Sequence, residues 1–351
     1  MRCRRWLVAA LLGNLLGGPD AARAVSPTTA EGGKREDVVT AVPGRVDTVR
    51  HEWSDSQRRR AIPVKLYFPA QGQGPYPVIV FSHGLGGSRD GYEYLGRHWA
   101  GQGYVSVHLQ HEGSDREVWS RSGEGMRALR AAAANPLNAI DRPRDVRFAI
   151  DQLVRLNRED PALKGRLDLD RIGVAGHSFG AHTALMVAGQ AMVGPLGRET
   201  TFADPRVKAA IAMSAPVPAR RDRLDRVYAG VTIACLHMTG TRDDSPIGET
   251  AAADRRIPFD HIRGGDQYLV TFAGADHMVF SGRRLAVGAN AQDARFQELI
   301  LQGSTAFWNV YLKGDRRAKA WLMQGGFEHA LGKDGRLEKR TAQSTPATHP
   351  R

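Results

Sequence analysis

The stretch that most constrains the fold is residues 170–188, DRIGVAGHSFGAHTALMVA. Its pattern predicts a short apolar strand over residues 172–175, a tight turn around Ser178 and a helix that begins near that serine. The turn reads G-x-S-x-G, and Gly176 and Gly180 lack a Cβ atom, so the strand and the helix can approach closely. Such a turn lifts the serine out of the sheet, in front of the positive end of the helix dipole. The pentapeptide alone also fits a glycine-flanked turn without chemistry, but the flanking strand and helix favour a nucleophile.

Apolar strands alternate with amphipathic helices along the rest of the chain. Strands are predicted over residues 77–82, 104–109, 207–214, 231–238 and 267–272, and helices over residues 92–102, 141–157 and 296–312. Residues 45–53 and 61–68 alternate in polarity and predict an antiparallel hairpin at the sheet edge. This order favours an α/β fold, in which a mostly parallel sheet carries helices on both faces and an N-terminal antiparallel hairpin.

The N-terminus has the organisation of a secretory signal peptide. Three arginines in residues 1–5 precede an apolar run over residues 7–16, and residues 22–24 have the A-x-A form of a cleavage site. We therefore expect a signal peptide over residues 1–24 and a secreted or periplasmic protein. The apolar run is too short to span a bilayer, so no stable membrane insertion is expected.

The sequence after residue 24 predicts one large domain between two polar segments. The chain has 351 residues, of which 42% are hydrophobic, and this composition suits a sizeable core. We expect a flexible leader over residues 25–44, one α/β domain over residues 45–331 and a disordered tail over residues 332–351. Within the domain, residues 110–138 read as an irregular cap or insertion, named the cap segment below.

Charge and cysteine content limit the partners. The net charge is +12, without a basic cluster or interleaved aromatic residues, so no nucleic-acid binding is expected. Cys3 leaves with the signal peptide, and Cys235 lies in an apolar run, where we expect a buried free thiol.

A serine nucleophile needs a base and an acid that orients the base. Asp243 follows the strand predicted over residues 231–238, and His277 follows the strand predicted over residues 267–272. Because parallel strands end at one edge of the sheet, Ser178, Asp243 and His277 are predicted to meet there, in the order Ser, Asp, His. Asp244 is the alternative acid.

Stabilisation of an oxyanion needs two backbone donors. One is predicted at Phe179, directly after the nucleophile, and the other at Leu85, in the glycine-rich turn after the strand over residues 77–82. His108 and His111 do not have the spacing of a metal-binding motif. No cofactor and no metal are therefore expected.

With these residues placed, the chain resembles the α/β-hydrolases, in the group similar to plasma-type platelet-activating-factor acetylhydrolase and bacterial predicted dienelactone hydrolases. The matching stretches are FSHGLGG (81–87), DRPRDVRFAIDQL (141–153), GHSFG (176–180), GTRDDSPIG (240–248) and GADHMVFSG (274–282). Two positions depart from the group. Dienelactone hydrolases proper use a cysteine where this chain has Ser178, and the acetylhydrolases usually have glycine where it has Ala181.

The resemblance implies an exported serine carboxylic-ester hydrolase without a cofactor. Its expected partner is a small-molecule or lipid-like ester with a short or truncated acyl group, because the cap segment lacks the wide apolar stripe of a lipase lid. A polyester-degrading, cutinase-like esterase and a serine peptidase or amidase are the enzymatic alternatives. A binding module that kept the fold without catalysis is the alternative from another class.

Overall fold

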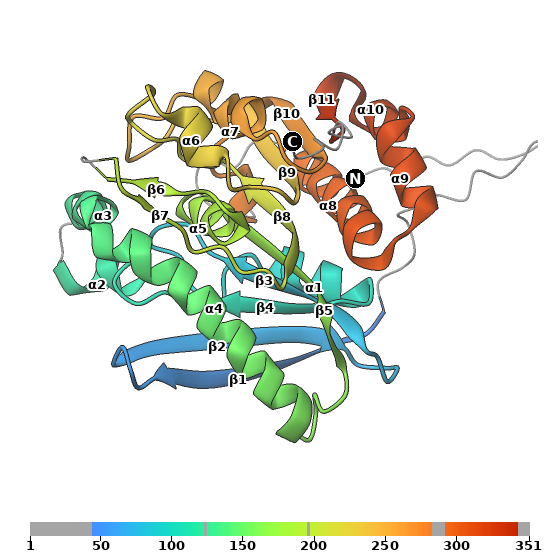
Figure 1. Ribbon diagram of the computed structural model, residues 1–351. Helices are drawn as coiled ribbons and strands as arrows, with labels where there is room; N and C mark the ends of the chain where they lie inside the picture. Colours follow the sequence, from blue (N-terminus) through green and yellow to red (C-terminus); the bar gives the residue numbers. More distant parts are fainter. Residues whose placement is uncertain (1–43, 123–124, 195–196, 283–291, 343–351) are drawn as a thin grey trace, which may run out of the picture. The chain divides into compact units, whose positions relative to one another are not determined.

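The computed structural model describes residues 44–122, 125–194, 197–282 and 292–342. The predicted signal peptide, and the predicted leader up to residue 43, lie outside these residues. Figure 1 shows a central sheet with helices packed against it.

The central sheet has nine strands in the order β1-β2-β4-β3-β5-β8-β9-β10-β11. The six strands from β4 to β10 pair in parallel, whereas β1–β2, β2–β4 and β10–β11 pair antiparallel. The mostly parallel sheet and the N-terminal hairpin are thus confirmed. The strands are β1 (Val46–Asp55), β2 (Arg60–Pro69), β3 (Tyr76–Ser82), β4 (Val105–Leu109), β5 (Leu167–His177), β8 (Val207–Met213), β9 (Ala234–Arg242), β10 (Gln267–Asp276) and β11 (Gly335–Arg340), and a separate hairpin holds β6 (Met192–Val193) and β7 (Glu199–Thr200).

Helices cover both faces of the sheet because the central strands are apolar on both sides. In β3, Val78 and Val80 join a core with α4 and α5, whereas Ile79 and Phe81 join a core with α1 and α8 (Figure 1). The helices are α1 (Glu93–Gly101), α2 (Glu117–Ser122), α3 (Gly125–Ala134), α4 (Pro136–Glu159), α5 (Phe179–Ala188), α6 (Leu224–Tyr228), α7 (Ile257–His261), α8 (Asp293–Lys313), α9 (Arg316–Met323) and α10 (Gly326–Leu331), with 3-10 turns η1 (Ala252–Arg256), η2 (Val279–Ser281) and η3 (Gly332–Asp334).

The cap segment is helical, so the prediction of an irregular stretch over residues 110–138 is wrong. It contains α2 and α3 and ends in the first turn of α4, where the Asn135 side chain caps the helix. Alanine has the highest helix propensity, and the run of four alanines at the end of α3 favours the helix that the scattered polarity concealed. Leu129 and Ala132 are the buried residues of α3.

The prediction of a disordered C-terminal tail over residues 332–351 is wrong for residues 332–342, which contain β11. Residues 335–340 pair antiparallel with β10 and form one edge of the sheet. Their charged side chains made the stretch look like a solvated tail. On an edge strand, however, charged side chains are common, and here Arg340 donates to the backbone oxygen of Phe259 at 2.7 Å.

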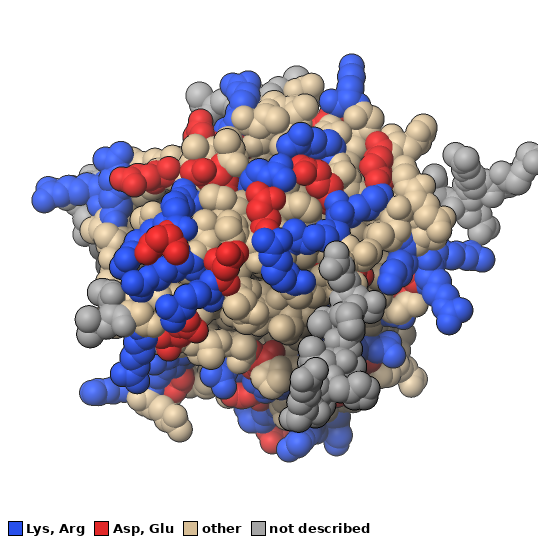
Figure 2. Space-filling model, turned by 45° about the horizontal axis from the view of Figure 1, so that its top comes forward, with Lys and Arg blue, Asp and Glu red and all other residues tan. Residues whose placement is uncertain are grey.

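The surface carries charges of both signs. Figure 2 shows one face on which lysine and arginine side chains are interspersed with aspartate and glutamate. Many form ion pairs, such as Arg226–Glu199 at 2.6 Å and Arg256–Glu338 at 3.1 Å. Among the described helices, none combines the length and the apolar character that a membrane span requires.

The pairing of β11 leads to a stability prediction. Leu337 is half-buried against the core on the α8 face, whereas its neighbour Arg336 is exposed. We expect Leu337→Asp to lower the free energy of unfolding by about 1–2 kcal/mol, because a charge replaces a leucine that packs against the core. Arg336→Asp is the matched control, with a change within about 0.5 kcal/mol. Urea denaturation measures both, and equal small effects would contradict the role of β11 in the fold.

Candidate active site

The turn at Ser178 is built by close backbone contacts. A Cβ atom on Gly180 would lie 1.9 Å from the backbone oxygen of Ser82, and one on Gly176 would lie 2.1 Å from that of Gly180. Both positions therefore require glycine, as the motif predicted. Ser178 itself has φ 55° and ψ −120°, a conformation that costs a non-glycine residue about 1–3 kcal/mol. The contacts with the end of β3 hold the serine in this strained conformation.

The structure brings the three predicted side chains into one hydrogen-bonded set. Ser178 Oγ lies 3.0 Å from His277 Nε2, and His277 Nδ1 lies 2.7 Å from Asp243 Oδ1. Ser178 begins α5, Asp243 directly follows β9 and His277 directly follows β10, at one edge of the sheet. Because the carboxylate only accepts, His277 donates from Nδ1, and Nε2 is free to accept the serine proton.

Asp243 is fully buried and has several donors. Ser214 Oγ donates to Oδ2 at 2.6 Å, and Thr239 Oγ1 donates to the same atom at 2.8 Å. Burial by itself would raise the pKa of Asp243, but the hydrogen bond from His277 and the charge of Arg255 outweigh it, and the pKa lies below its ordinary value. Asp244, the alternative acid, is exposed and accepts from the backbone of Ala252.

Arg255 is a site residue that the sequence analysis missed. Its side chain is buried, with Nη2 3.3 Å from His277 Nδ1 and Nε 3.5 Å from Asp243 Oδ1. It also donates from Nε to the backbone oxygen of Asp243 and from Nη1 to that of Ser214. The sequence around Arg255 does not distinguish it from a surface arginine, because only the folded chain places η1 next to the carboxylate of Asp243.

The loop of residues 83–87 after β3, named the oxyanion loop below, lies beside the start of α5. In the described part of the chain, the backbone N–H groups of Leu85 and Phe179 donate to no acceptor. Both residues are half-buried, as is Ser178. These two N–H groups are the donors that the sequence predicted for an oxyanion.

Two hydrogen bonds to the Gly84 carbonyl oxygen fix the orientation of the Gly84–Leu85 peptide. His83 Nδ1 donates to the Gly84 oxygen at 2.6 Å, and the Gly87 N–H donates to the same oxygen at 3.0 Å. His83 Nε2 accepts from the His111 N–H, so the ring is neutral, and burial places the pKa of His83 well below its ordinary value. In a trans peptide the N–H points away from the carbonyl, so fixing the Gly84 oxygen also aims the Leu85 N–H.

A second series of hydrogen bonds joins the oxyanion loop to the histidine. The Gly84 N–H donates to Tyr92 Oη at 3.1 Å, Tyr92 Oη lies 2.8 Å from His177 Nδ1, and His177 Nε2 lies 2.9 Å from the His277 oxygen. A backbone N–H only donates and a carbonyl only accepts, so Tyr92 donates to Nδ1 and His177 donates from Nε2. His177 thereby links the oxyanion loop, the segment of Tyr92 and the loop of His277.

Backbone strain is concentrated here. Among the described residues, four non-glycine residues have positive φ, and three of them belong to the site: Tyr92, Ser178 and Ser214. Such conformations persist only where the surroundings enforce them, and they are found disproportionately at functional sites.

A second serine–histidine–aspartate set lies nearby but is closed to solvent. Ser82 Oγ is 3.0 Å from His111 Nε2, and His111 Nδ1 is 2.9 Å from Asp145 Oδ2. Arg58 and Arg60 both bind Asp145, at 2.8 and 2.9 Å. Each of the three residues in the set is at most 2% exposed, so a substrate cannot reach Ser82. This set is a buried structural network.

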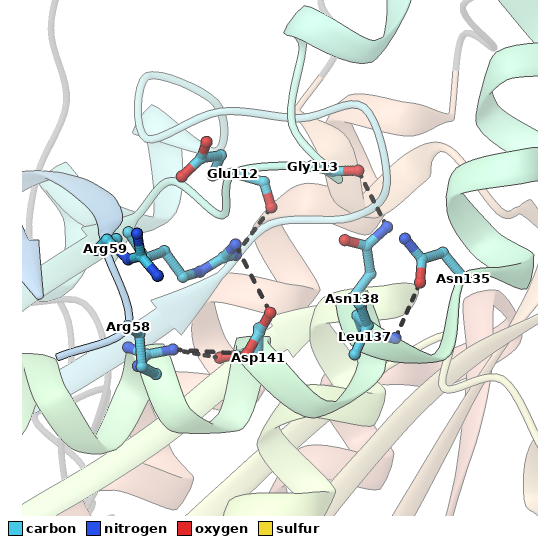
Figure 3. Close-up of a pocket in the computed structure, with 9 residues that line it drawn as sticks. Arg58, Arg59, Glu112, Gly113, Asn135, Leu137, Asn138 and Asp141 are labelled. Atoms are coloured by element: carbon cyan, nitrogen blue, oxygen red, sulfur yellow. Dashed lines mark hydrogen bonds and ion pairs between the residues drawn. The ribbon is translucent and has the colours of Figure 1, made fainter.

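A polar hollow of about 300 Å³ lies beside this network (Figure 3). In Figure 3, Arg58 and Asp141 lie on one side of it, and Asn138 donates to the Gly113 oxygen on the other. Ser178, Asp243 and His277 are not among its lining residues. The hollow is therefore not the space in which Ser178 would meet a substrate.

The mostly parallel sheet with helices on both faces and the strand–turn–helix at Ser178 are those of the α/β-hydrolase fold. A family model described as "Platelet-activating factor acetylhydrolase, isoform II" matches residues 56–118, which include the oxyanion loop. The platelet-activating factor acetylhydrolase of Cavia porcellus is 24% identical over 304 residues, covering 77% of this chain and 66% of that protein. Those of Canis lupus familiaris and Bos taurus are 27% and 26% identical over 155 and 240 residues, covering 35% and 58% of this chain and 34% and 48% of those proteins.

The protein has the α/β-hydrolase fold and is similar to these acetylhydrolases, as the sequence motifs predicted. The matches span slightly less than two thirds of the Cavia porcellus protein and less than half of the other two. The relatives' name, an acetylhydrolase, agrees with the prediction of an ester hydrolase.

The buried histidines lead to a prediction about pH. Burial lowers the pKa of four of them, His98, His108, His182 and His237, to about 3 or 4. Burial also holds the pKa of three others, His83, His111 and His177, well below the ordinary value. In the unfolded chain, histidines take up protons near pH 6.5. The unfolded state therefore binds more protons between about pH 6.5 and pH 4, and stability falls as the pH falls through this range.

We expect the free energy of unfolding, measured by urea denaturation at pH 7.5, 6 and 5, to fall as the pH falls, with a slope of at most about 1.4 kcal/mol per pH unit for each such histidine. His237 forms a hydrogen bond with Gln267 and none with the residues of the site. His237→Gln should therefore reduce the pH dependence of the free energy of unfolding by up to about 1.4 kcal/mol per pH unit, with no direct effect on the site. Equal stability at pH 7.5 and pH 5 would contradict the prediction.

Proposed function

We propose that this protein is a serine carboxylic-ester hydrolase that acts through Ser178, His277 and Asp243. The observation that carries the proposal is the hydrogen-bonded set from Ser178 Oγ to His277 Nε2 and from His277 Nδ1 to Asp243, on a strained and half-exposed serine. The name of the relatives supports ester hydrolysis as its activity.

In this mechanism, Ser178 Oγ attacks the ester carbonyl while His277 Nε2 takes the serine proton. His277 then returns the proton to the leaving alcohol, and Asp243 holds the tautomer and stabilises the imidazolium. The N–H groups of Leu85 and Phe179 hold the oxyanion of the tetrahedral intermediate. Water, activated by His277, attacks the acyl-enzyme and releases the acid.

We infer a short or truncated acyl group and a small or lipid-like ester. Trp119 lies against the oxyanion loop: a Cβ atom on Gly86 would lie 2.3 Å from Trp119 Nε1 and 3.0 Å from Leu129 Cδ2. The indole and Leu129 thus wall the space next to Leu85, and Trp119 remains 46% exposed. We also propose export, on the signal-peptide pattern of residues 1–24.

The first test replaces the nucleophile and the base. We expect Ser178→Ala and His277→Ala each to lower kcat on p-nitrophenyl butyrate by about 10⁶-fold, because each removes a group on which the others depend. A fluorophosphonate probe should label the native protein and not Ser178→Ala. Substantial hydrolysis by either variant would end the assignment, and hydrolysis of p-nitroanilides in preference to matched esters would indicate an amidase.

Two neighbouring acids give this test a matched control. Asp243→Asn should lower kcat by about 10⁴-fold, because the amide no longer holds the His277 tautomer. Asp244→Asn should leave kcat within a few-fold, since Asp244 only accepts from the backbone of Ala252. The opposite order of losses would assign the orienting role to Asp244.

The inferred acyl preference is tested with p-nitrophenyl acetate, butyrate, octanoate and palmitate, below and above their aggregation limits. We expect the highest kcat/KM on the short esters and no jump in rate at aggregation. Trp119→Ala should shift the optimum to longer chains by removing the wall beside Leu85. Met126→Ala, at a residue of α3 that is 41% exposed, is the matched control and should not shift it. A maximum at palmitate would refute the preference.

A further inference from the structure

Arg142, in α4, is a fully buried arginine whose guanidinium contacts three separate segments. Nη2 donates to the backbone oxygen of His83, Nη1 donates to Ser114 Oγ at 3.0 Å, and Nε donates to Thr183 Oγ1 at 3.0 Å. In the described part of the chain, no carboxylate lies within ion-pair distance of this group. Burial lowers the pKa of Arg142 to about 9.

On one side, these bonds bracket Leu85. Before Leu85 in the chain, Arg142 donates to the carbonyl oxygen of His83. After Leu85, the Gly86 N–H donates at 2.9 Å to the backbone oxygen of Ser114, and Arg142 donates to the side chain of the same serine. The Arg116 N–H also donates to the Gly87 oxygen at 2.7 Å, so the start of the cap segment and the oxyanion loop are joined by two backbone bonds.

On the other side, Arg142 holds Phe179. The guanidinium carbon lies 4.7 Å from the centre of the Phe179 ring, a cation–π contact. Thr183 Oγ1, which accepts from Arg142, donates in turn to the Phe179 backbone oxygen at 3.0 Å. One side chain thereby touches the segments that carry both proposed oxyanion donors.

We propose that Arg142 is a positioning residue that sets the distance between the Leu85 and Phe179 N–H groups and ties it to the cap segment. The inference rests on the proposed function. A planar guanidinium directs its N–H groups to three acceptors in fixed directions while its face stacks on a ring, and a lysine ammonium offers neither. Burying a charge that contacts no carboxylate directly costs free energy, which the more distant charges of Asp145 and Asp115 offset only in part. A side chain that only filled space would not need this charge.

The test measures kcat and KM for Arg142→Met and Arg142→Lys on p-nitrophenyl butyrate. Misplacement of the two donors should lower kcat by about 10²-fold in Arg142→Met and about 10-fold in Arg142→Lys, with KM within about threefold. The affinity for a trifluoromethyl ketone, which adds to Ser178 as a tetrahedral oxyanion, should fall in proportion to kcat/KM. Loss confined to KM, or unchanged affinity for the ketone, would overturn the proposal.

Arg340 provides a matched control, because it also donates to backbone oxygens and lies against an aromatic ring, but at a remote edge of the sheet. Its guanidinium donates to the backbone oxygens of Phe259 and Ile262 and lies 5.1 Å from the Phe259 ring. Arg340→Met should lower the melting temperature without lowering kcat more than twofold. An equal fall in kcat for Arg340→Met and Arg142→Met would show a general effect of stability and refute the proposal.

If Arg142→Met does not fold, Thr183→Val removes the two hydrogen bonds that join Arg142 to the Phe179 backbone oxygen, and it leaves the bonds to His83 and Ser114. It should lower kcat by roughly three- to tenfold. An unchanged kcat in both Thr183→Val and Arg142→Lys would overturn the proposal. The proposed function fails separately, when the native protein hydrolyses no ester or Ser178→Ala remains active. An active native enzyme with unaffected Arg142 variants would refute the positioning role alone.

Discussion

The site depends on the contact between Gly180 and the end of β3. The backbone oxygen of Ser82 lies where a Cβ atom of residue 180 would be, so any other residue would push α5 away from the sheet. This contact places the first turn of α5 beside the oxyanion loop, which begins directly after Ser82. Both proposed oxyanion donors and the strained serine therefore follow from one close approach of two backbones.

Neutral histidines fix the loops around this contact. His83 and His177 each donate from one ring nitrogen to a backbone carbonyl and accept at the other. Because burial holds the pKa of both histidines well below the ordinary value, both rings stay neutral near pH 7, and their donors and acceptors do not exchange. The set at Ser82 has the same hydrogen-bond polarity as the set at Ser178, so access to solvent, and not the residue types, distinguishes a proposed catalytic site from a structural network.

The parts of the fold that the sequence predicted are those with strong local patterns. The apolar run of β3, the glycines around Ser178 and the positions of Asp243 and His277 after strands need only nearest neighbours and the rule that parallel strands end at one edge. The cap helices were missed because their polarity is scattered, and β11 was missed because an edge strand carries charged side chains that look like a solvated tail.

The sequence by itself determined the nucleophile turn, the α/β class, the family resemblance and the order of the serine, acid and histidine, because each is encoded in a short stretch. Only the tertiary structure decided which arginines serve the site. Arg142 and Arg255 lie in α4 and η1, in stretches rich in other arginines, and nothing local separates them from surface residues. Packing removed these two from water and placed them against backbone carbonyls, an aromatic ring and a carboxylate that come from distant parts of the chain.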